Sequence, residues 1–100
     1  MNILLGGPGS GKTKELLKMS MENNIPVLCE SNARKERLLT KAEGYGYMIP
    51  VPVVYDNCGD VKEVYIDDIE RLCQTMFNCK INTISINITN KTDVNRMEEL

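Results

Sequence analysis

The sequence predicts an α/β domain with a small parallel sheet of about five strands and flanking helices. Short apolar runs bounded by glycine, proline or polar residues alternate with longer segments in which apolar residues recur at helical spacing. Strands that alternate with helices build parallel sheets through right-handed crossovers. The 100 residues contain no repeat, linker or low-complexity segment, which predicts one domain over residues 1–100.

The first half of the chain predicts two strand–helix units. Residues 2–5 and 26–29 are apolar runs typical of buried strands. Residues 12–23 and 32–43 have the apolar spacing of helices, and Gly44 is expected to end the second one. The core-facing positions of these helices are expected to be Leu16, Leu17, Met21, Ala33, Leu38 and Ala42.

The second half continues the alternation less regularly. Residues 47–55 are β-branched but contain Pro50 and Pro52, which predicts an edge strand or an extended loop, followed by a turn over 56–60. Residues 63–66 predict a strand, residues 69–78 a helix, and residues 82–89 a strand with one apolar face. The tail from Thr92 is expected to be a short helix or to fray. The core face of the last helix is expected to contain Ile69, Leu72, Cys73 and Met76.

Composition narrows the classes of function. The chain is 42% hydrophobic and 26% charged with a net charge of −2, which argues against nucleic-acid binding by the whole surface. No apolar run approaches the roughly 20 residues that cross a membrane. The four cysteines form no C-x-x-C pair and histidine is absent, so a zinc site is disfavoured. Free thiols without a signal peptide predict a cytoplasmic protein.

A glycine-rich loop follows the first predicted strand and matches G-x-x-x-x-G-K-[ST]. Glycines let successive main-chain N–H groups converge on one anion, and the helix that follows adds the positive end of its dipole. The lysine places a charge on the β- and γ-phosphates, and the threonine hydroxyl can ligate Mg²⁺. The loop therefore predicts a polyphosphate site formed by Gly6, Gly7, Pro8, Gly9, Ser10, Gly11, Lys12 and Thr13.

A second acidic element follows the strand over residues 63–66. Asp67 lies at the carboxyl end of this strand, where ligand sites of open α/β sheets form, and is expected to hold Mg²⁺ together with Thr13. Asp68 is the candidate base that polarises an attacking water. The alternative is that both carboxylates only cap the helix over residues 69–78.

The two motifs together resemble those of the P-loop NTPases, as Walker A and Walker B. The Asp67-Asp68 form, with Ile-Glu-Arg-Leu after it, is similar to additional-strand ATPases of the AAA+ initiator and helicase-loader type. The resemblance implies Mg²⁺ and ATP as cofactors, Lys12 and Asp68 as catalytic residues, and Asn90 as the sensor near the γ-phosphate. It departs from the family in having no lid domain with a second sensor arginine, and Asp68 where glutamate is usual.

Mg²⁺-dependent ATP binding with slow hydrolysis is therefore the expected function, with three alternatives. One is a non-hydrolysing regulatory module that responds to nucleotide binding. Another is a small nucleotide kinase. The third is a GTP-binding protein, because Asn90-Lys91-Thr92-Asp93 matches the guanine motif N-K-x-D.

Several charged residues remain open to more than one interpretation. Glu30 follows the second strand and is either a catalytic carboxylate or a solvated loop residue. A basic run on the second helix is interpreted as a solvated face, or alternatively as a contact for a partner or nucleic acid. Arg71 and Arg96 are candidates for a trans-acting finger in a homo-oligomer. The basic run consists of Arg34, Lys35, Arg37 and Lys41.

Overall fold

The computed structural model describes residues 1–87 and 94–97 and has the expected α/β class. In chain order, the elements of this part are β1 (Ile3–Leu5), α1 (Lys12–Asn23), β2 (Val27–Cys29), α2 (Asn32–Tyr45), β3 (Val53–Val54), the 3₁₀ helix η1 (Tyr55–Asn57), β4 (Tyr65–Ile66), α3 (Ile69–Phe77) and β5 (Val94–Arg96). The strands expected near residues 2–5, 26–29 and 63–66 are therefore present, each slightly shorter than predicted.

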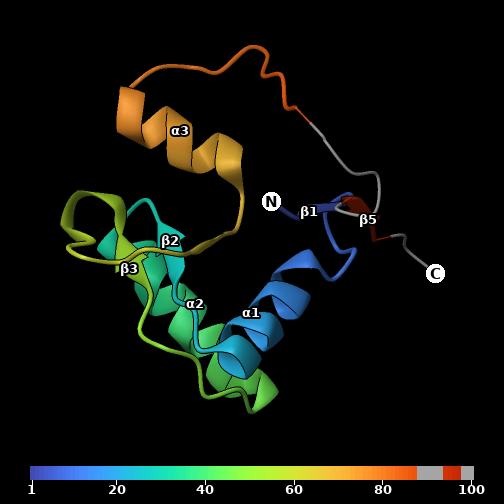
Figure 1. Cartoon of the computed structure of the whole chain (residues 1–100), viewed down its shortest axis with the longest axis vertical. Coiled ribbons are helices and arrows are strands. Elements are labelled where there is room, and N and C mark those ends of the chain that lie inside the picture. Colours follow the sequence, from blue (N-terminus) through green and yellow to red (C-terminus); the bar gives the residue numbers. More distant parts are fainter. Residues whose placement is uncertain (88–93, 98–100) are drawn as a thin grey trace.

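These strands form two parallel sheets where one sheet was expected. β5 pairs with β1, with Ile3 opposite Val94. β2 lies between β3 and β4 in the other sheet, so β3 is an edge strand, as its prolines predicted. In Figure 1, α1 and α2 lie on one side of β2 and β3, and α3 lies on the other. One edge of β1 and one edge of β4 have no strand partner among the described residues.

Left-handed residues cap the C-termini of all three α-helices of the described chain. α1 ends at Asn24 (φ 53°) and α3 at Asn78 (φ 52°). α2 continues through Gly44 and ends at Gly46 (φ 77°), whose N–H donates to the carbonyls of Ala42 and Glu43. The predicted stop at Gly44 was wrong because Gly46, not Gly44, adopts the left-handed conformation that closes a helix.

The core lies between α1, α2 and β2. Leu17, Val27 and Leu38 are fully buried, and the smaller Ala42 and Cys29 are nearly so. Their apolar contacts hold the first two strand–helix units together. This part of the core was predicted correctly, except that Ala33 is exposed because it lies on the outer side of α2.

α3 is much less buried than predicted. Leu72 is buried and Cys73 half-buried, whereas Ile69 and Met76 are exposed by 43% and 44%. The helical spacing of these residues correctly defined one apolar face of the helix. It did not determine how much of that face another element would cover, because burial depends on the tertiary arrangement.

The C-terminal part departs most from the predictions. Residues 82–87 are exposed and form no strand, and residues 88–89 lie outside the described range. β5 (Val94–Arg96) occupies the position expected to be a short helix or a frayed end. Alternation of apolar and polar residues produces a strand only where a neighbouring strand can pair with it, and β1 pairs with β5 instead.

The described part of the chain includes no helix with both the length and the apolar character required to cross a bilayer.

Cys29 offers a test of this core. Its side chain is 3% exposed, and burial raises the pKa of its thiol above the ordinary 9.0. We expect a thiol reagent at pH 8 to modify the exposed Cys79 rapidly and Cys29 only after unfolding, since the thiolate is the reactive form. Because burial raises the pKa of this thiol only in the folded chain, the contribution of Cys29 to stability should fall as pH rises above 9.0. In that range the Cys29 thiol of the unfolded chain ionises first.

Mass spectrometry of the labelled peptides measures both rates. Equal labelling of Cys29 and Cys79 in the folded protein would contradict the position of Cys29 in the core.

Candidate functional site

The glycine-rich loop connects β1 to α1, as expected. Gly6 follows β1 directly, and a side chain there would collide with the side chain of Ser10 and the carbonyl of Met97. Gly11 caps α1 in the left-handed conformation (φ 88°) and provides no side-chain cap. The loop therefore depends on glycine at both positions, at one for space and at the other for backbone conformation.

Lys12 folds back over this loop. Its ammonium group donates hydrogen bonds to the carbonyls of Gly6 at 2.5 Å and Gly7 at 2.9 Å, and lies 3.4 Å from the hydroxyl of Ser10. The positive charge is thus held beside the main chain of the loop. An anion bound in the loop would lie next to this charge and next to the amino end of α1.

Thr13 and Asp67 meet although they are 54 positions apart in the sequence. The Thr13 hydroxyl lies 3.0 and 3.2 Å from the two carboxylate oxygens of Asp67 and donates to them. Thr13 belongs to the first turn of α1, and Asp67 directly follows β4. The structure therefore brings together the two residues that were expected to hold the magnesium ion jointly.

Arg34, on α2, also contacts Asp67. Its guanidinium donates to Asp67 Oδ2 at 2.7 Å, and its Nε lies 3.9 Å from Glu30 Oε1. The side chains of Arg34, Asp67 and Glu30 are exposed by only 12%, 9% and 10%. The interpretation of Arg34 as part of a solvated face was wrong, and so was that of Glu30 as a solvated loop residue.

Local structure explains the position of Arg34. Ser31 caps α2 and accepts a hydrogen bond from the Arg34 main chain at 3.1 Å, which places Arg34 in the first turn of the helix. That turn follows the carboxyl end of β2, and β2 pairs in parallel with β4, which Asp67 directly follows. A basic residue in the first turn after a neighbouring parallel strand was the signal that could have identified Arg34.

Asp68 is directed elsewhere. It caps α3, with Oδ1 accepting from the Arg71 main chain at 3.2 Å and Oδ2 lying 3.5 Å from the Arg71 guanidinium. Both carboxylate oxygens thus interact with its own helix, as the capping alternative predicted for this residue. Its role as a catalytic base stays a prediction. Asn90 and the N-K-x-D residues Lys91, Thr92 and Asp93 lie outside the described residues.

The oxygen donors fit a magnesium ion that is shared with a phosphate. Mg²⁺ prefers oxygen ligands and usually takes one or two carboxylates, with waters and substrate phosphates completing its shell. Thr13 and Asp67 supply a hydroxyl and a carboxylate in contact. Within residues 1–87 and 94–97, no group of three or more His, Cys, Asp or Glu could hold a metal ion.

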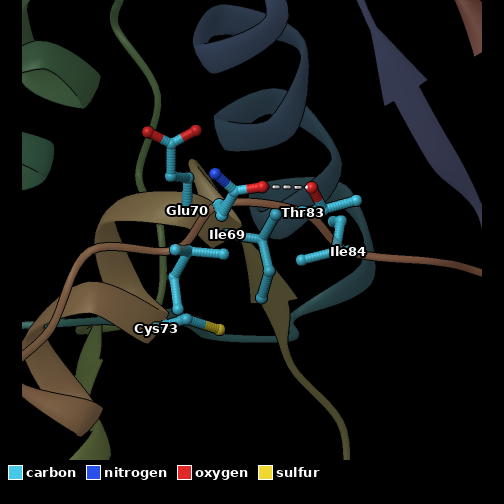
Figure 2. A pocket seen from close by; sticks show the side chains of 7 residues that line it. Ile69, Glu70, Cys73, Thr83 and Ile84 are labelled. Carbon is cyan, nitrogen blue, oxygen red and sulfur yellow. Dashed lines mark hydrogen bonds between the residues drawn. The ribbon is translucent and has the colours of Figure 1, made fainter.

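Two hollows lie away from this site. Figure 2 shows the one between α3 and the segment after it, with Ile69, Cys73 and Ile84 around it. Its volume of about 90 Å³ is small for a nucleotide, because ligand pockets usually measure roughly 300 Å³ or more. A second, shallow hollow of about 480 Å³ lies beside the start of α2 and β3, and its lining includes Asn32, Lys35 and Asp56. Neither is lined by Lys12, Thr13 or Asp67.

Comparisons of the chain with protein-family models, curated proteins and solved structures gave no significant match.

Proposed function

We propose that this chain binds a magnesium–nucleoside triphosphate at the β1–α1 loop, with ATP as the principal ligand, and hydrolyses it slowly. The main-chain N–H groups of the loop and of the first turn of α1 would bind the phosphate oxygens. Lys12 would exchange the loop carbonyls of Gly6 and Gly7 for the β- and γ-phosphates. Thr13 and Asp67 would hold the metal ion, and the ion would neutralise negative charge on the phosphate tail.

The Thr13–Asp67 contact supports this proposal most strongly. A glycine-rich loop occurs in many proteins without binding a phosphate, and an acidic residue after a strand is equally common. The sequence placed the two residues 54 positions apart, and their side-chain oxygens lie 3.0 Å apart in the structure. A shared metal site is the function for which a hydroxyl and a carboxylate at these two positions are both required.

A binding module without turnover is the second candidate, and the geometry of Asp68 favours it. Hydrolysis needs a group that orients the attacking water. Asp68 is occupied by Arg71 and by the cap of α3, and Glu30 is close to Arg34. Turnover would then require a partner that rearranges one of these carboxylates or supplies an arginine of its own.

Calorimetry with four ligands tests the proposal. We expect ATP with Mg²⁺ to bind most tightly, ADP about tenfold more weakly, and AMP not measurably, since the loop and Lys12 contact the phosphate tail. The affinity for GTP, compared with that for ATP, measures the selectivity for the base. Phosphate release from ATP then separates slow hydrolysis from binding alone. Equal affinity for ATP and AMP, or no binding of either triphosphate, would contradict the proposal.

A further inference from the structure

We infer that Arg34 is the counter-ion of Asp67 while no nucleotide is bound, and that it transfers to the phosphate tail when a divalent cation enters with the triphosphate. This inference rests on the proposed function and adds to it a positioning residue that couples metal and phosphate binding.

The charges at the site require such a counter-ion. Asp67 is 9% exposed, and a carboxylate so far from water is costly unless it is paired. Arg34 provides the pairing at 2.7 Å, and the Thr13 hydroxyl provides a further hydrogen bond to the same oxygen, Oδ2, at 3.0 Å. The guanidinium thus places a positive charge at the carboxylate oxygen that a metal ion would also contact.

The guanidinium and a divalent cation compete for Asp67. Both are positive, and both interact most strongly in direct contact with a carboxylate oxygen. A metal ion held by Thr13 and Asp67 would lie beside the present position of the Arg34 nitrogen, because that nitrogen and the Thr13 hydroxyl share Oδ2. Like charges at such a distance repel, so binding of the metal ion to Asp67 weakens the contact of Arg34 with Oδ2.

The displaced guanidinium has a suitable new partner. Glu30 is its other acidic neighbour, at 3.9 Å, and contacts only the Nε side of the group. The planar guanidinium carries five donors in a geometry that matches phosphate as well as carboxylate. A phosphate tail at the start of α1 would lie next to Thr13, the residue with which Arg34 already shares an acceptor.

The inference predicts that one substitution changes two affinities in opposite directions. In Arg34→Gln, a divalent cation alone should bind Asp67 about tenfold more tightly, since the competing charge is gone. The same variant should bind Mg²⁺–ATP about tenfold more weakly, since a phosphate ligand is gone. A residue that only supported the fold would weaken both.

The experiment measures both affinities on the full chain. Mn²⁺ alone, followed by electron paramagnetic resonance, reports the metal site, and calorimetry with Mg²⁺–ATP reports the nucleotide site. Arg37→Gln is the matched control, because Arg37 is exposed and lies one turn further along α2, and it should leave both affinities within twofold of the unmodified chain. If Arg34→Gln does not fold, Arg34→Lys takes its place. In that variant the affinity for Mn²⁺ alone should rise about threefold and the affinity for Mg²⁺–ATP should fall about threefold.

Opposite shifts in either Arg34 variant support the inference. If the unmodified chain binds Mg²⁺–ATP and the variants show parallel losses or no change, the inference is overturned while the proposed function stands. If the unmodified chain binds no triphosphate, the proposed function fails, and the inference fails with it.

Discussion

Replacing Lys12 with alanine is expected to weaken Mg²⁺–ATP binding by roughly 10- to 100-fold, the range that corresponds to the loss of a hydrogen bond from a charged group. The ammonium group already lies at the loop, 2.5 Å from the Gly6 carbonyl and 2.9 Å from that of Gly7, and would exchange these two hydrogen bonds for phosphate oxygens. Calorimetry measures the change, and phosphate release should fall with it.

Lys18→Ala is the matched control for this experiment. Lys18 lies on the same helix and is exposed, so its removal changes the net charge equally without touching the loop. We expect the affinity of the Lys18→Ala variant for Mg²⁺–ATP to stay within about twofold of that of the unmodified chain. Equal losses in the two variants would mean that the effect is one of overall charge, and the assignment of Lys12 would be wrong.

Two substitutions of Asp67 are expected to separate its role in the fold from its role in binding. Asp67→Ala removes the partner of the nearly buried Arg34, and we expect the free energy of unfolding to fall by about 3 kcal/mol. Asp67→Asn retains the shape of the side chain and two polar atoms but lacks the charge that binds a metal. In this variant, ATP affinity should no longer increase when Mg²⁺ is added.

Urea unfolding and calorimetry with and without Mg²⁺ provide the two measurements. Asp60→Asn serves as the control, because Asp60 is exposed in the turn before β4. It should leave both the stability and the magnesium dependence unchanged. If Asp67→Asn retained the full magnesium dependence, the metal ion would have to be held elsewhere.

The first half of the fold and the two motifs were predictable because local signals determine them. Gly11 at the start of α1 and the αL residue Asn24 at its end follow from backbone preferences. The apolar spacing of Leu16, Leu17 and Leu38 identified the buried faces of α1 and α2. Asp67 was predicted as a magnesium ligand because it follows the carboxyl end of a strand. It does contact Thr13, although β1 and β4 belong to different sheets.

The errors concern features that depend on distant partners. Residues 82–87 have the alternation of a strand, yet β1 pairs with Val94–Arg96, which carries almost no strand signal of its own. Arg34 looked like one of several surface bases, because its neighbours Arg37 and Lys41 are indeed exposed. Only the tertiary arrangement, in which α2 begins beside the end of β4, brings its guanidinium to Asp67.

We expect the main-chain amides of the β1–α1 loop to bind the phosphate tail of a nucleotide. Amide chemical shifts of the isotope-labelled chain, recorded during titration with Mg²⁺–ATP, test it most directly. We expect the largest changes at Gly7, Gly9, Gly11 and Thr13, with smaller changes at Asp67. Unchanged loop amides at saturating ATP, or changes confined to the hollow beside α3, would contradict the account.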